Sequence, residues 1–204
     1  MTITYVVESG LYVNLTNRCP NHCTFCIRRE GDGAYGSDSL WLEHEPSADE
    51  VVDAIFKNDL SQYNELVFCG YGEPLERLDT VKEVIERVKQ KAPSLPIRIN
   101  TNGLADLSMG RPTAKELQGL VDVISISLNA PNATVYQEYC RCEYGEKAFD
   151  AILAYAKDCV QYLPAVILSV LDILTPKQIA KCNTIAQSIG ARFRVRHYIT
   201  ASES

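Results

Sequence analysis

The chain has 204 residues, 46% of them hydrophobic and 23% charged, and its 20 basic and 26 acidic residues give a net charge of −6. These values exclude a disordered or low-complexity chain. Domains have on the order of 150 residues, so the length predicts one domain over residues 1–204. Without a basic excess, broad electrostatic binding to nucleic acid or to an anionic membrane is not expected.

The compartment follows from two features of the sequence. The first ten residues lack the pattern of a signal peptide, and the longest apolar run, at residues 165–171, is far shorter than the ~20 residues that cross a bilayer. We therefore expect a cytoplasmic protein. In a reducing compartment, the eight cysteines are expected to be metal ligands or buried thiols rather than disulfides.

Apolar runs alternate with amphipathic helical patterns along the whole chain. Three helix starts carry a capping box, in which a hydroxyl and a Glu or Gln three residues later satisfy free backbone amides: Ser47 with Glu50, Thr113 with Glu116, and Thr175 with Gln178. Six segments have strand patterns: Leu11–Thr16, Glu65–Cys69, Pro96–Thr101, Asp122–Leu128, Ala165–Asp172 and Arg192–Ile199.

Strands that alternate with helices predict an α/β fold with a parallel sheet. Six units are too few for a closed eight-stranded barrel, which typically needs ~250 residues, so a partial barrel and a doubly wound sheet both fit. We predict the first of these, an open parallel β/α barrel of about six βα units. Residues 27–46 form a long irregular stretch, and such loops are usually functional or mobile.

Three cysteines follow the first predicted strand with the spacing C-x3-C-x2-C: Cys19, Cys23 and Cys26. Thiolates select zinc, copper(I) or iron–sulfur clusters. A closed structural site normally takes four protein ligands, and the next cysteine is as distant as Cys69. Three ligands leave a coordination position open for a small molecule. Two alternatives remain open, namely three unliganded cysteines, and zinc bound by the three cysteines with His22.

A glycine-rich turn, Gly70-Tyr71-Gly72-Glu73-Pro74, follows the second predicted strand. Such a turn lets backbone groups approach a ligand, and it is followed here by a carboxylate and a rigidifying proline. The third predicted strand ends in Asn100-Thr101-Asn102-Gly103, which also fits an ordinary Asn-Gly turn.

The fourth predicted strand is polar on one face. Side chains alternate along a strand, so Ser125, Ser127 and Asn129 share a face opposite Ile124, Ile126 and Leu128. A parallel strand buried on both faces should be apolar on both. The polar face therefore predicts a wet or ligand-filled lumen, with hydroxyls satisfied by neighbouring backbone as the alternative.

The cysteine motif, with Phe25 just before its last cysteine, and the Gly-Tyr-Gly-Glu-Pro turn together resemble the radical S-adenosylmethionine (SAM) superfamily. The resemblance implies a [4Fe–4S] cluster held by Cys19, Cys23 and Cys26, whose fourth iron is chelated by the amino and carboxylate groups of SAM. One-electron cleavage of SAM then gives a 5′-deoxyadenosyl radical that abstracts hydrogen from a substrate. It also implies an electron donor such as flavodoxin or ferredoxin.

The same resemblance implies which residues contact the cofactors. Tyr71 replaces the first glycine of the commoner form of the turn, so the glycine expected to approach the ligand is Gly72. The match is weakest on the fifth predicted strand, which carries Ser169. The implied cofactor-binding residues are Phe25, Gly70, Tyr71, Gly72, Glu73, Asn100, Thr101, Ser127, Asn129 and Ser169.

The last predicted strand places Arg192, Arg194 and Arg196 on one face. A solvated edge strand guarded by charge is the favoured interpretation. In the functional alternative, Arg194 or Arg196 binds a carboxylate or phosphate, since guanidinium suits such anions. His197 is a candidate proton donor near the substrate, although a structural role is favoured for it.

The remaining cysteines divide into two groups. Cys159 and Cys182 lie on apolar helix faces and are expected to be buried thiols. Cys140 and Cys142 lie after the fourth strand, where a reactive or redox pair is favoured over an auxiliary cluster.

Within the superfamily, the small size and the opening GLYVNLTNRCP resemble the TatD-associated members. A glycyl-radical activase is an alternative, whereas a deazaguanine-forming synthase is disfavoured because residues 27–29 read Ile-Arg-Arg in place of Asp-Thr. Outside the class, the alternative is a non-catalytic metal module, with structural zinc or an electron-transfer cluster. A hydrolase lacks an evident nucleophile–base pair.

Overall fold

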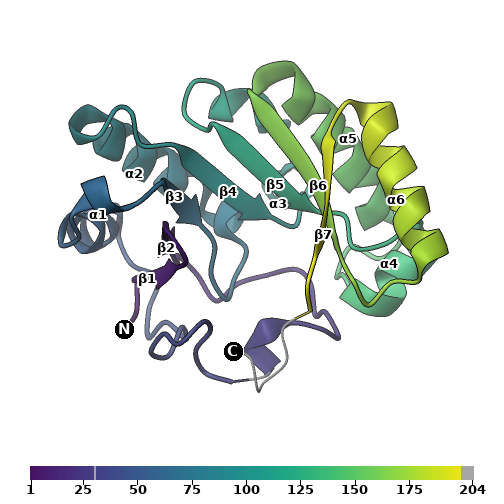
Figure 1. Cartoon of the computed structure of the whole chain (residues 1–204), viewed down its shortest axis with the longest axis horizontal. Helices are drawn as coiled ribbons and strands as arrows, with labels where there is room; N and C mark the ends of the chain where they lie inside the picture. Colours follow the sequence, from purple (N-terminus) through teal and green to yellow (C-terminus); the bar gives the residue numbers. More distant parts are fainter. Residues whose placement is uncertain (30, 199–204) are drawn as a thin grey trace.

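The computed structural model of the chain describes residues 1–29 and 31–198. One sheet of seven strands runs through the molecule in the order of the sequence (Figure 1). The strands are β1 (Thr4–Val7), β2 (Gly10–Val13), β3 (Glu65–Phe68), β4 (Ile97–Thr101), β5 (Val123–Ser127), β6 (Ala165–Leu171) and β7 (Arg192–Arg196). β2 to β7 are parallel, and β1 pairs with β2 antiparallel.

The strand order decides between the two topologies that the sequence allows. Each parallel strand pairs with the next one along the chain, as in a barrel, whereas in a doubly wound sheet the order of the strands reverses part-way across the sheet. β1 and β7 are the two edges in the described strands, so the barrel is open. The predicted partial barrel is confirmed, with β1 as an addition that the sequence did not reveal. The last predicted strand was placed too far, because β7 ends at Arg196 and Ile199 lies outside the described residues.

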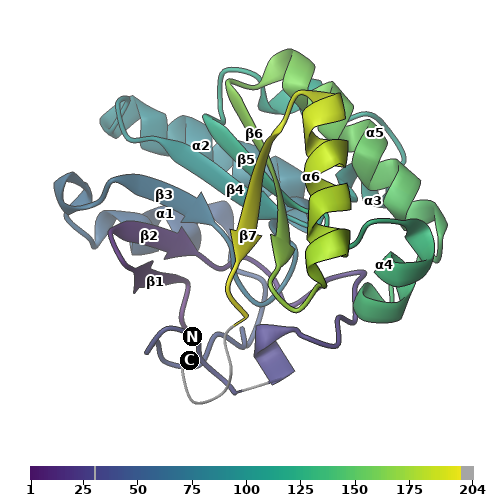
Figure 2. The same ribbon diagram turned by 45° about the vertical axis from the view of Figure 1, so that its right-hand side comes forward.

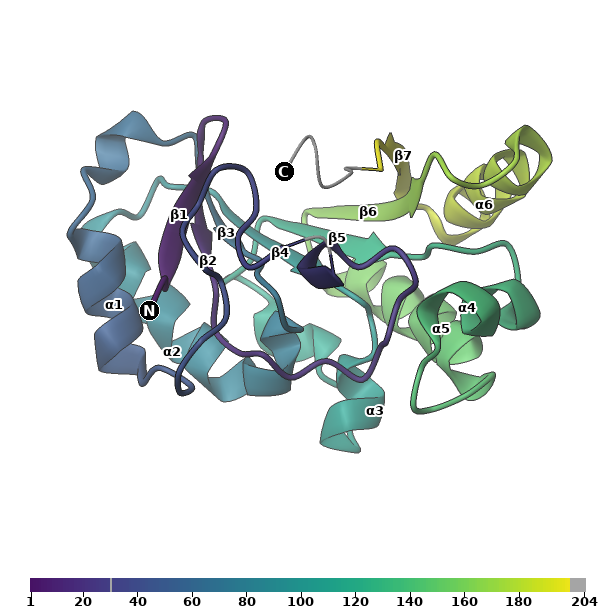
Figure 3. The same ribbon diagram turned by 90° about the horizontal axis from the view of Figure 1, so that it is seen from below.

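The helices cover one side of the curved sheet, and the chain that follows β2 crosses beneath the strand ends (Figures 2 and 3). They are α1 (Ala48–Phe56), α2 (Leu78–Lys91), α3 (Ala105–Met109), α4 (Ala133–Cys140), α5 (Lys147–Tyr162) and α6 (Pro176–Ile189). Short 3-10 turns are η1 (Ile27–Arg29), η2 (Leu60–Gln62), η3 (Pro74–Arg77) and η4 (Ala114–Leu117). No helix in the described part of the chain is long and apolar enough to cross a bilayer.

The core lies between the sheet and these helices. Alternate strand residues such as Phe68, Ile99, Ile126 and Leu168 are fully buried there. Their neighbours face the lumen, the concave side of the sheet, where Ser127 pairs in register with Ser169 and Ser169 with Arg194. The alternation therefore gives an apolar outer face and a polar inner one.

Two of the three predicted capping boxes are confirmed, at the starts of α1 and α6, and Gly190 ends α6 in the left-handed conformation. The third is wrong. The Thr113 amide and hydroxyl both donate to Asp106 Oδ1 at 2.8 Å, while Glu116 pairs with Lys82 at 2.6 Å. Residues 114–117 form a 3-10 turn. Partners distant in the sequence have taken the groups that a local capping box would use.

Candidate functional site

A cavity of about 320 Å³ opens at the carboxyl ends of the parallel strands. All the candidate cysteine, cofactor-binding and pocket residues inferred from the sequence line it. They come from the loops after β2 and β3, from the end of β4, from β5 to β7, and from positions just after β5 and β7. One site therefore gathers motifs that are up to ~180 residues apart in the chain, as expected where parallel strands end together.

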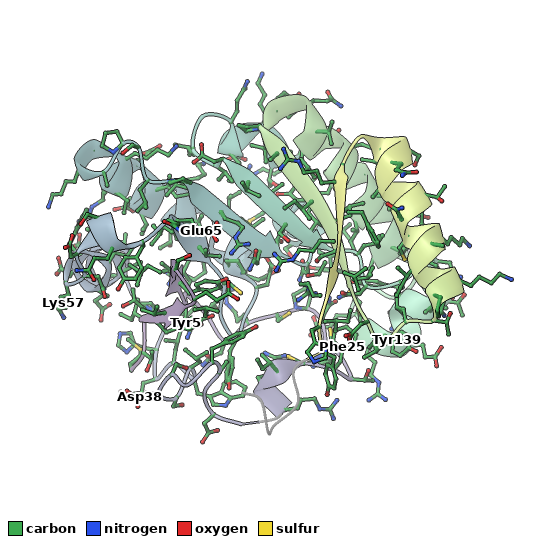
Figure 4. The ribbon with its side chains drawn as sticks, viewed as in Figure 1. Tyr5, Phe25, Asp38, Lys57, Glu65 and Tyr139 are labelled. Carbon is green, nitrogen blue, oxygen red and sulfur yellow. The ribbon has the colours of Figure 1, made fainter. Side chains whose placement is uncertain are left out.

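The segment from Cys19 to Cys26, here called the cysteine loop, is fixed by backbone hydrogen bonds to the end of α4. The His22 and Thr24 amides donate to the carbonyls of Cys140 and Tyr139 at 2.9 and 2.8 Å, and the Glu143 amide donates to Pro20 at 2.9 Å. The rings of Phe25 and Tyr139 lie 6.4 Å apart, side by side in Figure 4. These contacts fix the loop against α4.

The three half-buried thiols share a partly desolvated environment. Burial raises the pKa of Cys19 to about 12 and also raises that of Cys26, while a hydrogen bond with the Cys140 thiol, together with burial, raises the pKa of Cys23. Thiols in this environment hold their protons until a cation or cluster replaces them, since metal ligation requires the thiolate.

The zinc alternative with His22 does not match this arrangement. The His22 ring is exposed, with Nε2 3.4 Å from Glu143 Oε1. In residues 1–29 and 31–198, no three His, Cys, Asp or Glu side chains are grouped around the position of a single metal ion. The three thiols line one cavity, and thiolates also ligate iron–sulfur clusters.

Gly70 and Gly72 allow the turn after β3 to lie against the chain that follows β2. A Cβ atom on Gly72 would overlap the backbone carbonyls of Thr16 and Arg18, and one on Gly70 would overlap the Asn14 side chain. The Glu73 amide then donates to the Arg18 carbonyl at 2.8 Å. The close approach expected between Gly72 and a ligand is thus, in the structure, an approach to the backbone beside the cysteine loop.

The contacts of Tyr71 explain why a tyrosine stands where the commoner form of this turn has a glycine. Its side chain is buried, and its hydroxyl donates to the carbonyls of Gly31 and Gly33 at 2.7 and 3.0 Å. Its ring packs edge-on against Trp41, with centroids 5.1 Å apart. Tyr71 therefore anchors the long loop 27–46 over the cavity, a role that glycine could not fill.

Glu73 ties the ends of β3 and β4 together. Its Oε1 accepts from the Thr101 hydroxyl at 2.7 Å and from the Leu75 amide at 3.0 Å, and its Oε2 accepts from the Asn102 amide at 2.6 Å. Burial raises the pKa of Glu73 to about 7, although these hydrogen bonds act in the opposite direction. Thr101, an implied cofactor contact, uses its hydroxyl to orient this carboxylate.

The polar ends of β5 and β6 face the same cavity. Asn129 is buried in the left-handed conformation (φ 56°), with Nδ2 3.8 Å from Cys140 Sγ. The Ser169 hydroxyl donates to the Ile126 carbonyl at 3.5 Å. Asn100 hydrogen-bonds the Cys69 thiol.

β7 combines both interpretations of its arginines. Arg192 and Arg194 are exposed, as expected of an edge strand, while Arg196 is half-buried, and Arg194 and Arg196 both line the cavity. Edge strands expose charge where the edge faces solvent, whereas this edge closes one side of the lumen. His197 pairs through Nδ1 with Asp172 Oδ2 at 2.7 Å, in keeping with the structural role favoured for it.

Comparison with known proteins agrees with this geometry, since residues 13–176 match the radical SAM superfamily. The chain belongs to the radical SAM superfamily. Among curated radical SAM relatives, the GTP 3′,8-cyclase of Lactiplantibacillus plantarum is 29% identical over 145 residues, covering 71% of this chain and 41% of the relative. The probable dual-specificity RNA methyltransferase RlmN of Chlorobium phaeobacteroides is 29% identical over 127 residues, covering 55% of this chain and 31% of that one. This chain thus spans about two fifths or less of these relatives.

Solved structures show the same radical SAM fold. A radical SAM methyltransferase from Sphaerobacter thermophilus superposes with a TM-score of 0.66 at 13% identity, covering 98% of this chain and 70% of that one. SuiB of Streptococcus suis, solved with SAM bound, gives 0.65 at 16% identity over 93% and 38%. The TatD-associated subgroup stays a prediction.

The cofactors of a radical SAM protein, a [4Fe–4S] cluster and SAM, fit the residues present. Cys19, Cys23 and Cys26 are the thiol donors, and Glu73 and the strand ends beyond them line the adjoining space. The sequence reasoning missed further lining residues: Tyr5, Tyr12, Asn21, Tyr35, Cys69, Arg98 and Asn102. Arg98 and Asn102 lie two residues before and after Asn100, on the same face of the chain at β4. The alternation argument applied to Ser125 and Ser127 could therefore have found them.

Proposed function

We propose that this protein is a radical SAM enzyme that removes hydrogen from a substrate bound in the open barrel. The observation that supports this is the single cavity lined by the three thiols of the cysteine loop, by Glu73 and by the polar faces of β5 to β7. When bound, the cluster and SAM supply a carbon radical by one-electron reduction.

The chain's own residues bind, orient and shield. Cys19, Cys23 and Cys26 hold the cluster, and Asn102 Nδ2, 3.9 Å from Cys19 Sγ, contributes a hydrogen-bond donor beside it. Glu73 is oriented to accept a hydrogen bond from the amino group of SAM, since three donors fix its two oxygens. Loop 27–46, anchored by Tyr71, covers the cavity and excludes water.

Anaerobic reconstitution tests the proposal. We expect a brown protein with about four irons per chain that releases 5′-deoxyadenosine when reduced in the presence of SAM. A cluster that assembles fully but neither binds nor cleaves SAM would contradict the catalytic proposal and leave the electron-transfer module as the explanation.

The one-electron donor is proposed to be a flavodoxin or ferredoxin that docks on the outer side of the cysteine loop. Cys19 lines the cavity and also a separate outer groove, where Arg18, Arg28 and Arg29 outnumber Glu76 and Glu143. The arginines of this groove suit an acidic carrier protein. Reversing the charge of the exposed Arg29 to Glu should slow reduction by flavodoxin but not by dithionite.

A reducing cytoplasm is the compartment we propose. All eight cysteines are free thiols, and Cys140, Cys142, Cys159 and Cys182 are buried, the last two as expected. Cys140 lies against Cys23 rather than in a site of its own.

A further inference from the structure

Two arginines face the open side of the lumen without a carboxylate partner in the described part of the chain. Arg194 and Arg196 both line the cavity. Arg196 donates from Nη2 to Asn129 Oδ1 at a long 3.4 Å, and its Nε is buried without a hydrogen-bond partner. Burial lowers the pKa of Arg196, because its charge is desolvated and uncompensated.

Five other arginines of this acidic chain have a carboxylate partner, whereas Arg28, Arg29, Arg141 and Arg192 have no ion pair in the described residues. Ion pairs join Arg18 and Arg77 to Glu45, Arg87 to Asp49, Arg98 to Glu65 and Arg111 to Glu116. A desolvated charge without a counter-charge is costly, so its retention at a cavity wall indicates a ligand that supplies the opposite charge. Guanidinium recognises carboxylates and phosphates through paired hydrogen bonds.

The two arginines are separated from Glu73 by the width of the sheet, while Arg196 is connected to the cysteine loop through Asn129, Cys140 and Cys23. β4, β5 and β6 separate β3, which leads to Glu73, from β7, and each step between strands adds ~4.8 Å. Burial raises the pKa of Tyr35, in the long loop, and the positive charges of Arg194 and Arg196 oppose that shift, so this hydroxyl lies near both of them. The arginines therefore border the open edge between β1 and β7, where a substrate can enter.

We propose that Arg194 and Arg196 bind a carboxylate or phosphate group of the substrate, an inference that rests on the radical SAM function proposed above. Tyr35, which lines the same cavity, supplies a neutral donor to the same group. The substrate is thus an anionic small molecule, held by its charged end at β7 with its remainder toward SAM.

The test uses the cluster-reconstituted, SAM-saturated protein, with inorganic phosphate and acetate as probes in equilibrium dialysis. Arg194→Gln and Arg196→Gln are compared with Arg192→Gln, a matched control, because Arg192 lies on the same strand but does not line the cavity. We expect the wild type and Arg192→Gln to bind at least one probe alongside SAM. Binding should weaken about tenfold or more in each of the other two variants, with SAM affinity within about twofold of wild type.

Three results would overturn the inference. One is that neither probe binds the wild type, and another is equal binding in Arg192→Gln and Arg196→Gln. The third is competition between probe and SAM with weakened SAM binding in Arg196→Gln, which would assign the arginine to the carboxylate of SAM. Failure of the proposed function is recognised separately, because the wild type would then release no 5′-deoxyadenosine whatever the probes do.

Discussion

Arginines on the two walls of the lumen differ in whether they have a charged partner. On the β2–β4 wall, Arg98 Nη2 pairs with Glu65 Oε1 at 2.7 Å and donates to the Tyr12 hydroxyl at 3.0 Å. On the β7 wall, Arg196 has no carboxylate partner in the described residues and donates to Asn129 Oδ1 at a long 3.4 Å. Nε is buried without a hydrogen-bond partner in both arginines, so the walls differ in ion pairing and not in this atom. The charge on the first wall is balanced within the protein, whereas the charge on the second would be balanced by an added anion, which fits a cofactor side completed in advance and a substrate side completed by binding.

The largest effect is expected in the cysteine loop of the completed side. Cys23→Ala should abolish the cluster, taking iron from about four atoms per chain to near zero, while the far-UV circular dichroism stays that of the wild type. The fold survives because backbone hydrogen bonds to α4 hold the loop.

Cys182→Ala is the matched control, since Cys182 is a buried thiol on α6, outside the cavity. It should keep its iron. Collapse of the fold in Cys23→Ala but not in Cys182→Ala would instead indicate a structural metal.

The two buried arginines give the sharpest contrast. Arg98→Met should destabilise the ligand-free protein by about 2–3 kcal/mol, because it leaves Glu65 and Tyr12 without their partner. Arg196→Met should leave stability unchanged or raise it by about 1 kcal/mol, because it removes a desolvated charge. Urea unfolding of both variants checks this, and equal losses in the two would remove the distinction between the walls.

Gly72→Ala tests how tightly the completed side is built. The added methyl group meets the Thr16 and Arg18 carbonyls, so we expect a loss of about 1–3 kcal/mol and slower cluster assembly. Gly31→Ala is the control, since its Cβ would lie an ordinary 3.9 Å from the Gly33 carbonyl. Assembly at the wild-type rate in Gly72→Ala would show that the close approach is not needed.

The smallest effects concern helix starts, which should not distinguish the two sides. Ser47→Ala at α1 and Thr175→Ala at α6 each remove a capping box and should each cost about 1 kcal/mol in thermal unfolding. A much larger loss at α6 would mean that the β7 side is unstable as a whole, rather than incomplete at Arg196.

The α1 capping box also has a pH signature. A hydrogen bond from the Ser47 amide, with further ones from His44 and the Ser47 hydroxyl, lowers the pKa of Glu50 to about 2. The stabilising contribution of the ionised Glu50 carboxylate is therefore complete above the ordinary pKa of 4.5 and is lost as the pH falls through about 2. Glu50→Gln should show a weaker loss of stability than the wild type over this range.

The sequence by itself determined the repeating unit and the identity of the site. Cysteine spacing, the glycine-rich turn and polar alternation are local patterns, and each stands directly after an apolar strand; these were enough to predict the partial barrel and the residues around one cavity. The short N-terminal strand β1 escaped, because four residues beside a turn carry little periodicity.

Only the tertiary structure decided which of these groups are satisfied. Thr113 hydrogen-bonds Asp106 instead of capping its own helix start. Tyr71 hydrogen-bonds the Gly31 carbonyl, and Gly72 lies against the backbone beside the cysteine loop. Arg196, which alternation alone places on an edge strand, lies in a cavity without a counter-charge in the described residues. Whether a polar side chain has a partner depends on contacts far apart in the chain, and no local pattern encodes them.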